Sequence, residues 1–287
     1  MILVTGATGR IGREVVRELA ALGAEFRALV RKNTDADKLS AQGVETVLGD
    51  FAQPQSIQTE LQGVEQVFLL SPSSPMQTKF EGALVDEAKN AGVKHIVKLS
   101  ALGADSQANS ALLKWHRQSE QKIETSGVAY THLRPNGFNQ NFVPFYAPSV
   151  ATDGMLYAPA EDCKISWVDT RDIGAVAARV LTESGHEGNS YEITGSEALS
   201  YAQIAEKLSA LVGKKVTYVN VPDEGARQAM ISSGAPDWYA NALVALYQFY
   251  RQGDGAVVTD TVEQVTKTKP RSLDAYFEEN AQAFKGS

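Results

Sequence analysis

Cysteine is almost absent from this sequence, and the absence excludes several kinds of site. Cys163 is the single cysteine among 287 residues, so neither an internal disulfide nor a metal site built from several cysteines can form. The acidic pair before it, Glu161 and Asp162, disfavours a reactive thiolate. The histidines His95, His132 and His186 lack the mutual spacing of metal ligands. We therefore expect no metal centre.

Excess positive charge and long apolar runs are lacking too. The net charge is −7 and the sequence pI is about 5.2, so there is no global electrostatic footprint for nucleic acid. No apolar run approaches the length that a bilayer requires. A strand pattern already begins at residue 2, so we expect no signal peptide. These absences predict a cytoplasmic protein that binds neither nucleic acid nor membrane.

The most informative motif present is a glycine loop after the first apolar run. Ile2–Thr5 leads into Gly6-x-x-Gly9-x-x-Gly12, a helical pattern covers 11–22, and a second apolar run covers 26–30. Such glycines allow a tight turn, close approach of a pyrophosphate, and close helix packing on the strand. The motif predicts dinucleotide binding by the loop residues Gly6, Thr8, Gly9, Arg10, Ile11 and Gly12.

Strand-like and helical patterns alternate up to about residue 135. Strands are expected at 2–5, 26–30, 46–48, 66–70, 95–99 and 129–133, and helices at 11–22, 54–61, 77–91 and 110–126. This alternation predicts an α/β fold with a doubly wound parallel sheet of the Rossmann type. We expect an NADP-binding domain over residues 1–135.

The pattern becomes less regular in the second half. The segment 136–159 is rich in Asn, Pro, Gly and aromatics, which is typical of loops that shape a pocket. Helices follow at 171–183, 200–212, 223–250 and 272–284, with strands at 191–194 and 216–221. We expect a smaller substrate-binding lobe over 136–287, interleaved with the first domain and returning one element to its sheet.

The end of the second strand indicates which dinucleotide binds. NAD-selective sites place an acid there, whereas this sequence has Arg31 and Lys32. A guanidinium matches the geometry of a phosphate, so we predict NADP(H) rather than NAD(H). Asp50 and Phe51 follow the third strand, where they could meet the adenine, although Asp50 could equally cap a helix. Three residues at the ends of the fourth and fifth strands are expected to flank ribose and nicotinamide: Leu70, Ser71 and Ser100.

These motifs resemble the NmrA-like branch of the atypical short-chain dehydrogenase/reductases, over nearly the whole chain. Within it they are similar to the bacterial NADPH-dependent triphenylmethane reductase and quinone oxidoreductase members. The residues that carry the resemblance lie at 4–12, 29–31, 49–51, 91–97, 130–142, 169–173 and 213–216. The resemblance implies that Arg31 meets the 2′-phosphate. It also implies that the segment after Arg134, beginning with Pro135 and Asn136, borders nicotinamide and substrate.

One departure from typical short-chain dehydrogenases concerns catalysis. Their Tyr-x-x-x-Lys pair, in which the lysine lowers the pKa of the tyrosine, occurs nowhere in this sequence. Leu112 and His116 stand at the matching positions, and Glu120 shares the helical face of His116. His116 could donate a proton or a hydrogen bond to the acceptor, or it could be a structural histidine satisfied by Glu120 or a carbonyl.

The missing tyrosine favours an acceptor that takes hydride before it gains a proton. Quinones and similar planar electrophiles meet that condition, and the protein's task is then to orient the reactants. Aromatic residues after 135 could form the wall of a substrate pocket, although single aromatics are more often core: Phe138, Phe142, Phe145, Tyr146, Tyr157 and Trp167.

Two other functions remain open on the same scaffold. A non-catalytic NADP(H)-sensing regulator would bind the dinucleotide without turnover and use a protein partner. A nucleotide-sugar or isoflavone-reductase-like enzyme is disfavoured by the missing Tyr-x-x-x-Lys and by His116 at the lysine position. Aromatics of the helical segment 223–250 could form a homodimer face or pack that helix onto its own lobe: Trp238, Tyr239, Tyr247 and Phe249.

Overall fold

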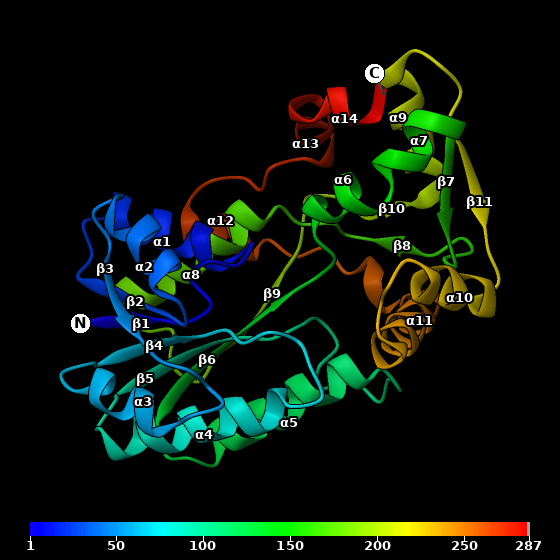
Figure 1. Ribbon diagram of the computed structural model, residues 1–287. Coiled ribbons are helices and arrows are strands. Elements are labelled where there is room, and N and C mark those ends of the chain that lie inside the picture. Colours follow the sequence, from blue (N-terminus) through cyan, green and yellow to red (C-terminus); the bar gives the residue numbers. More distant parts are fainter. Residues whose placement is uncertain (286–287) are drawn as a thin grey trace.

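A seven-stranded parallel sheet forms the centre of the protein, of which the computed structural model describes residues 1–285 (Figure 1). The strand order is β3-β2-β1-β4-β5-β6-β9. The strands are β1 (Ile2–Val4), β2 (Phe26–Val30), β3 (Glu45–Leu48), β4 (Gln66–Leu69), β5 (His95–Leu99), β6 (Ala129–Pro135) and β9 (Ser190–Ile193). Six of them match the strands expected from the sequence up to residue 135, and the predicted doubly wound α/β fold is confirmed.

Alternate side chains of each central strand enter two different cores, as expected of a sheet that is covered on both faces. In β1, Ile2 and Val4 join one core and Leu3 joins the other. Helices α1 (Gly12–Ala21), α8 (Thr170–Thr182) and α12 (Thr261–Thr266) cover the first face. The second face carries α3 (Gln55–Gln58), the 3-10 turn η1 (Thr59–Leu61), α4 (Gln77–Asn90) and α5 (Ala111–Glu124), as Figure 1 shows.

A third core belongs to a smaller lobe beyond the carboxyl ends of the strands. Two small sheets pair β7 (Met155–Ala158) with β11 (Thr217–Asn220), and β8 (Lys164–Ile165) with β10 (Leu199–Ser200). The remaining elements are η2 (Asn139–Asn141), α6 (Phe142–Phe145), α7 (Ala147–Asp153), α9 (Tyr201–Val212), α10 (Asp223–Ser232), α11 (Asp237–Arg251), η3 (Asp254–Ala256), α13 (Leu273–Glu279) and α14 (Ala281–Lys285).

The second half of the chain also contributes to the sheet domain. Strand β9 pairs with β6, helix α8 packs on α1, and α12 packs on α8 and β9 (Figure 1). A domain boundary at residue 135 therefore fits the change in the sequence pattern, but in the folded protein elements after residue 135 belong to the sheet domain as well. Among residues 1–285, no helix has the length and apolar character needed to cross a bilayer.

Several local expectations need correction. A short helix, α2 (Asn33–Ser40), was not expected because Leu39 is its only buried residue and gives no periodic signal. The segment 136–159 contains two helices and a strand rather than only loops. The helix expected at 223–250 is broken between α10 and α11, where Gly234 has a φ of 92° and the extended Pro236 is the N-cap of the next helix. Likewise, the helix expected at 272–284 is interrupted at Asn280.

Candidate functional site

The glycine loop has the geometry of a close backbone approach. Gly6 has a φ of 66°, and a Cβ there would lie 2.8 Å from Leu70 Cγ. A Cβ on Gly12 would lie only 2.0 Å from the carbonyl oxygen of Gly6. Thr8, Gly9 and Arg10 are exposed at the start of α1, where the first backbone N–H groups of a helix lack intrahelical partners. The Gly9 N–H already donates to the Gly6 carbonyl oxygen at 2.9 Å, so the N–H groups of its neighbours are the ones open to an anion. Side chains at Gly6 and Gly12 would overlap Leu70 and the loop itself, so this tight turn, the glycine cradle, requires glycine at both positions.

The side chains of Ile11 and Arg10, two residues of this loop, contact the protein itself. The Ile11 side chain is buried in the core beneath α1, so only its backbone can meet a ligand. The Arg10 guanidinium reaches the second lobe and donates to Asn141 Oδ1 at 2.6 Å. Arg10 thus links the glycine loop to the second lobe.

The two cations after β2 are free for an anion. Arg31 and Lys32 are exposed, and neither side chain has an ion-pair or hydrogen-bond partner within residues 1–285. After the next strand, the Asp50 backbone N–H donates to Ser56 Oγ, and Asp50 Oδ1 accepts from the Ala52 backbone N–H at 2.9 Å. Asp50 thus closes a local turn with one carboxylate oxygen, and its other oxygen has no hydrogen-bond partner among the described residues. Phe51 is half-buried against the second core of the sheet.

The residues expected around ribose and nicotinamide have side chains that are already engaged within the protein. The Ser71 hydroxyl donates to Glu81 Oε1 at 2.8 Å, and the Ser100 hydroxyl donates to Glu120 Oε1 at 2.7 Å. Asn136 donates to Ser166 and to the Gly255 carbonyl, and its own Oδ1 accepts from the next backbone N–H. Leu70 packs on Gly6. The side chains of Ser71, Ser100 and Asn136 therefore hold the protein together, and side-chain contacts from them to a cofactor are not supported.

A buried ionic cluster, which the sequence reasoning missed, lies behind His116. Lys98 on β5 and Glu81 on α4 are fully buried, and Lys98 Nζ lies 2.9 Å from Glu81 Oε1. The imidazole Nδ1 of His116 lies 3.2 Å from Gln77 Nε2 and 3.4 Å from Lys98 Nζ. Burial and the charge of Lys98 hold the pKa of His116 well below its ordinary value. His116 is therefore neutral near pH 7, and Glu120 is not its partner.

Glu120 belongs to a second buried cluster, one helical turn further along α5. It accepts from Arg134 Nε at 2.9 Å, from Arg134 Nη2 at 2.8 Å and from Arg117 Nη1 at 3.0 Å. Burial raises the pKa of Glu120, but hydrogen bonds from Arg134 and Ser100 outweigh it and hold the pKa at about 2. This cluster fixes α5 against the end of β6.

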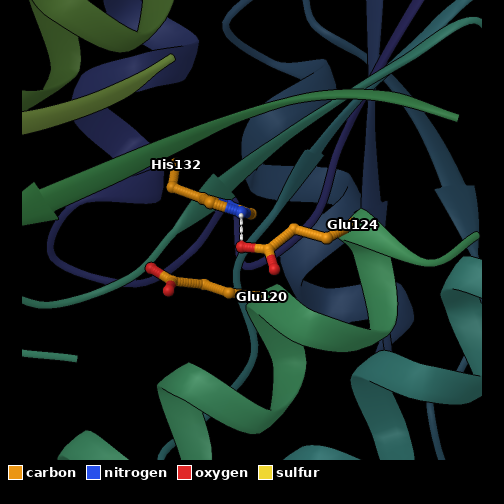
Figure 2. Close-up of side chains that lie close together, drawn as sticks. All are labelled: Glu120, Glu124 and His132. Carbon is orange, nitrogen blue, oxygen red and sulfur yellow. Dashed lines mark ion pairs between the residues drawn. The ribbon is translucent and has the colours of Figure 1, made fainter. Parts of the chain in front are cut away.

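One grouping among the described residues has metal-ligand spacing: Glu120, Glu124 and His132 (Figure 2). His132 Nε2 lies 3.4 Å from Glu124 Oε1. However, both oxygens of Glu124 accept hydrogen bonds from Arg117, and both oxygens of Glu120 accept from guanidinium groups. A cation there would face two arginines, so the donor set does not suit a metal.

Three of the six aromatics expected in a pocket wall pack in the core of the second lobe: Phe142, Tyr146 and Trp167. Phe142 is fully buried, with its ring centroid 4.8 Å from that of Trp167, which is also buried. The Tyr146 hydroxyl lies 2.9 Å from that of Tyr201 and 2.7 Å from that of Tyr247. On β7, Tyr157 is exposed while its neighbours face the core, so it points away from them. Of the expected set, Phe138 stays half-buried near β6 and Phe145 is 60% exposed.

The expected dimer face and the cysteine have structural explanations. Phe249 is buried, Tyr247 joins the hydroxyl cluster, and the Trp238 ring centroid lies 5.5 Å from that of Trp115 on α5. These aromatics thus pack α11 onto its own molecule. Burial raises the pKa of the Cys163 thiol to about 11, which disfavours a reactive thiolate.

Comparisons with known proteins agree with this geometry. The model of the NmrA-like family matches residues 1–278. An NAD(P)H azoreductase of Xenophilus azovorans is 40% identical over 284 residues, covering 99% of each chain. The NADPH-bound crystal structure of an Escherichia coli quinone oxidoreductase superposes with a TM-score of 0.90 at 32% identity, covering 98% of each chain. The Citrobacter sp. triphenylmethane reductase, complexed with NADP(H), has a TM-score of 0.87 at 28% identity, covering 98% of this chain and 99% of its own.

The match over nearly the full chain, together with the glycine cradle and the seven-stranded order, settles the classification. This protein is a member of the NmrA-like family.

Proposed function

We propose that the protein is an NADPH-dependent oxidoreductase that delivers hydride to a quinone or a similar planar, electrophilic acceptor. The observation that carries the proposal is the pairing of the glycine cradle with Arg31, an unpaired cation at the end of the next strand. A cradle for a pyrophosphate beside a free guanidinium for a 2′-phosphate fits NADP(H).

Each part of the cofactor has a counterpart in the chain. The N–H groups at the start of α1 would hold the pyrophosphate, Arg31 and Lys32 the 2′-phosphate, and the free oxygen of Asp50 the adenine amino group. Backbone of Leu70, Ser71, Ser100 and Pro135 would line the ribose and nicotinamide end, because all four lie at the carboxyl edge of the sheet. NADPH bound in this cradle supplies the hydride.

The proposed class of acceptor is based on the absence of a Tyr-x-x-x-Lys pair from helix α5. With Leu112 and His116 in place of tyrosine and lysine, α5 offers no phenol to protonate an alcohol oxygen. Acceptors that take hydride readily do not need that group. The half-buried Phe138 and the exposed Phe145 on α6 would offer apolar surface to a flat acceptor.

The test is NADPH oxidation, followed by absorbance, with panels of quinones, cationic triarylmethane dyes and azo dyes. We expect turnover with at least one planar class and little with simple ketones. Tight NADPH binding without turnover on any acceptor would contradict the proposal and favour the cofactor-sensing regulator. Efficient reduction of simple ketones would contradict the acceptor class.

A further inference from the structure

We propose that Lys98, held by Glu81, positions the imidazole of His116 and supplies it with a proton. His116 then delivers the proton that a quinone requires during reduction. The proposal rests on the proposed reductase function and adds to His116 two residues that the motif-based reasoning did not reach, Lys98 and Glu81. It assigns a role to a fully buried lysine that belongs to no motif of the sequence.

The hydrogen bonds of Lys98 fix the direction of the network. An ammonium group has three hydrogens and no acceptor. Three acceptors surround Lys98 Nζ: Glu81 Oε1 at 2.9 Å, the Leu99 carbonyl oxygen, and His116 Nδ1 at 3.4 Å. The imidazole Nδ1 must therefore accept, which leaves the proton of the neutral ring on Nε2. Ser71 donates to the same Glu81 oxygen and holds that carboxylate in place.

The other nitrogen of His116 faces outward. Within the described residues, Nε2 has no hydrogen-bond partner and is not among the buried atoms that lack one. The neighbours of Nδ1 are Gln77, the first residue of α4, and Lys98, the penultimate residue of β5. Both lie toward the carboxyl edge of the sheet, where ligands of open α/β sheets bind. His116 thus presents an Nε2–H group at the edge where the acceptor is proposed to bind.

This arrangement can move one proton in a balanced step. Hydride addition to a quinone leaves an oxyanion that needs a proton. The Nε2–H bond of His116 breaks as that proton passes to the oxyanion, and a proton from Lys98 forms a new bond at Nδ1. Lys98 is then neutral, and His116 is neutral throughout. After product release, a proton from water enters at Nε2 and the Nδ1 proton returns to Lys98.

A cationic triarylmethane dye provides the comparison, because it becomes neutral on taking hydride and needs no proton. We would measure turnover of a quinone and of such a dye in the wild type, His116→Gln and Lys98→Met. The expected result is a fall in the quinone-to-dye turnover ratio of about tenfold or more in both variants, as for loss of a general acid. Lys94→Met, which removes an exposed lysine just before β5, is the control and should keep the wild-type ratio.

A second measurement does not depend on activity. In protein with ¹⁵N-labelled histidine, His116 is identified by the signal that His116→Gln removes. The wild type should show protonated Nε2 and unprotonated Nδ1. Lys98→Met should weaken that preference and raise the pKa of His116, since the positive neighbour is gone while Glu81 and Glu120 remain. Should Lys98→Met fail to fold because Glu81 is left unpaired, Lys98→Met combined with Glu81→Gln removes both charges.

The outcomes separate the two proposals. No wild-type turnover with any acceptor contradicts the proposed function and, with it, the proton delivery. Turnover with both acceptors but an unchanged ratio in His116→Gln and Lys98→Met overturns the proton delivery alone. A protonated Nδ1 in the wild type overturns the positioning by Lys98.

Discussion

The carboxylate of Glu120 accepts two hydrogen bonds from the guanidinium of Arg134, at 2.9 Å from Nε and 2.8 Å from Nη2. Glu120 is fully buried on α5, and Arg134 is nearly buried on β6. Both charges are removed from water, so the pair compensates each of them, with Arg117 as a further partner of Glu120 and Asp105 as a further partner of Arg134. The pair ties the helix that carries His116 to the sheet.

Glu120→Gln is expected to lower the free energy of unfolding by about 3 kcal/mol, because Arg134 would lose its buried counter-ion and keep only the exposed Asp105. Denaturant unfolding measures the change. Glu183→Gln, which breaks the exposed pair with Arg179 on α8, is the control, and exposed pairs contribute only about 0–1 kcal/mol. Similar losses from the two variants would contradict the buried role of Glu120.

Stability should also depend on pH in a predictable direction. Burial lowers the pKa of His95, His116 and His132 below that of an unfolded histidine, about 6.5. The unfolded chain therefore binds more protons below that pH, and the folded state loses stability as pH falls. Glu120, with a pKa of about 2, adds a further loss below its ordinary value of 4.5. A thermal unfolding midpoint that stays level or rises on mild acidification would contradict this.

Gly12→Ala is expected to abolish NADPH binding and to destabilise the fold. Its Cβ would overlap the Gly6 carbonyl, and only the backbone of the loop could move to relieve the overlap. Titration with NADPH and thermal unfolding check both effects. Gly82→Ala in α4 is the matched control, since its Cβ has no neighbour closer than 3.9 Å. That variant should gain about 0.5–1 kcal/mol from helix propensity and keep NADPH binding.

Arg31→Ala should weaken NADPH binding about tenfold or more, which corresponds to loss of one charge-assisted hydrogen bond. The dissociation constant of NADH should change little, because that cofactor has no 2′-phosphate. Arg17→Ala, on the exposed face of α1, is the control. Equal wild-type affinities for NADPH and NADH would contradict the predicted selectivity.

The sheet domain was predictable because its elements repeat a strong pattern. Strands such as β1 are continuous apolar runs, and the expected helix at 77–91 matches α4 within one residue. The short helix α2 escaped prediction because Leu39 alone is buried in it. Proline and glycine at 234–236 predict a break in principle, but the aromatic clustering further along favoured one continuous helix.

The buried charges behind the site could not be predicted from motifs. Lys98 lies within an apolar strand and Glu81 shares a helix face with Leu84, Val85 and Ala88, which is a weak signal for a buried pair. Whether such groups meet depends on the register of β5 and the rotation of α4, which a single sequence does not specify. The predicted pocket wall was wrong at Phe142 and Trp167 for a similar reason. Aromatic residues suit a pocket wall and a core equally, and these two rings pack against each other.

Hydride delivery is the central claim, and isotopic transfer tests it most directly. The protein would be incubated with NADPH carrying deuterium at the transferable position of the nicotinamide ring and with a cationic triarylmethane dye. We predict a reduced dye whose mass is greater by one deuterium, bonded to the central carbon. Bleaching of the dye without deuterium in the product, or bound NADPH that remains unoxidised, would contradict the proposed function.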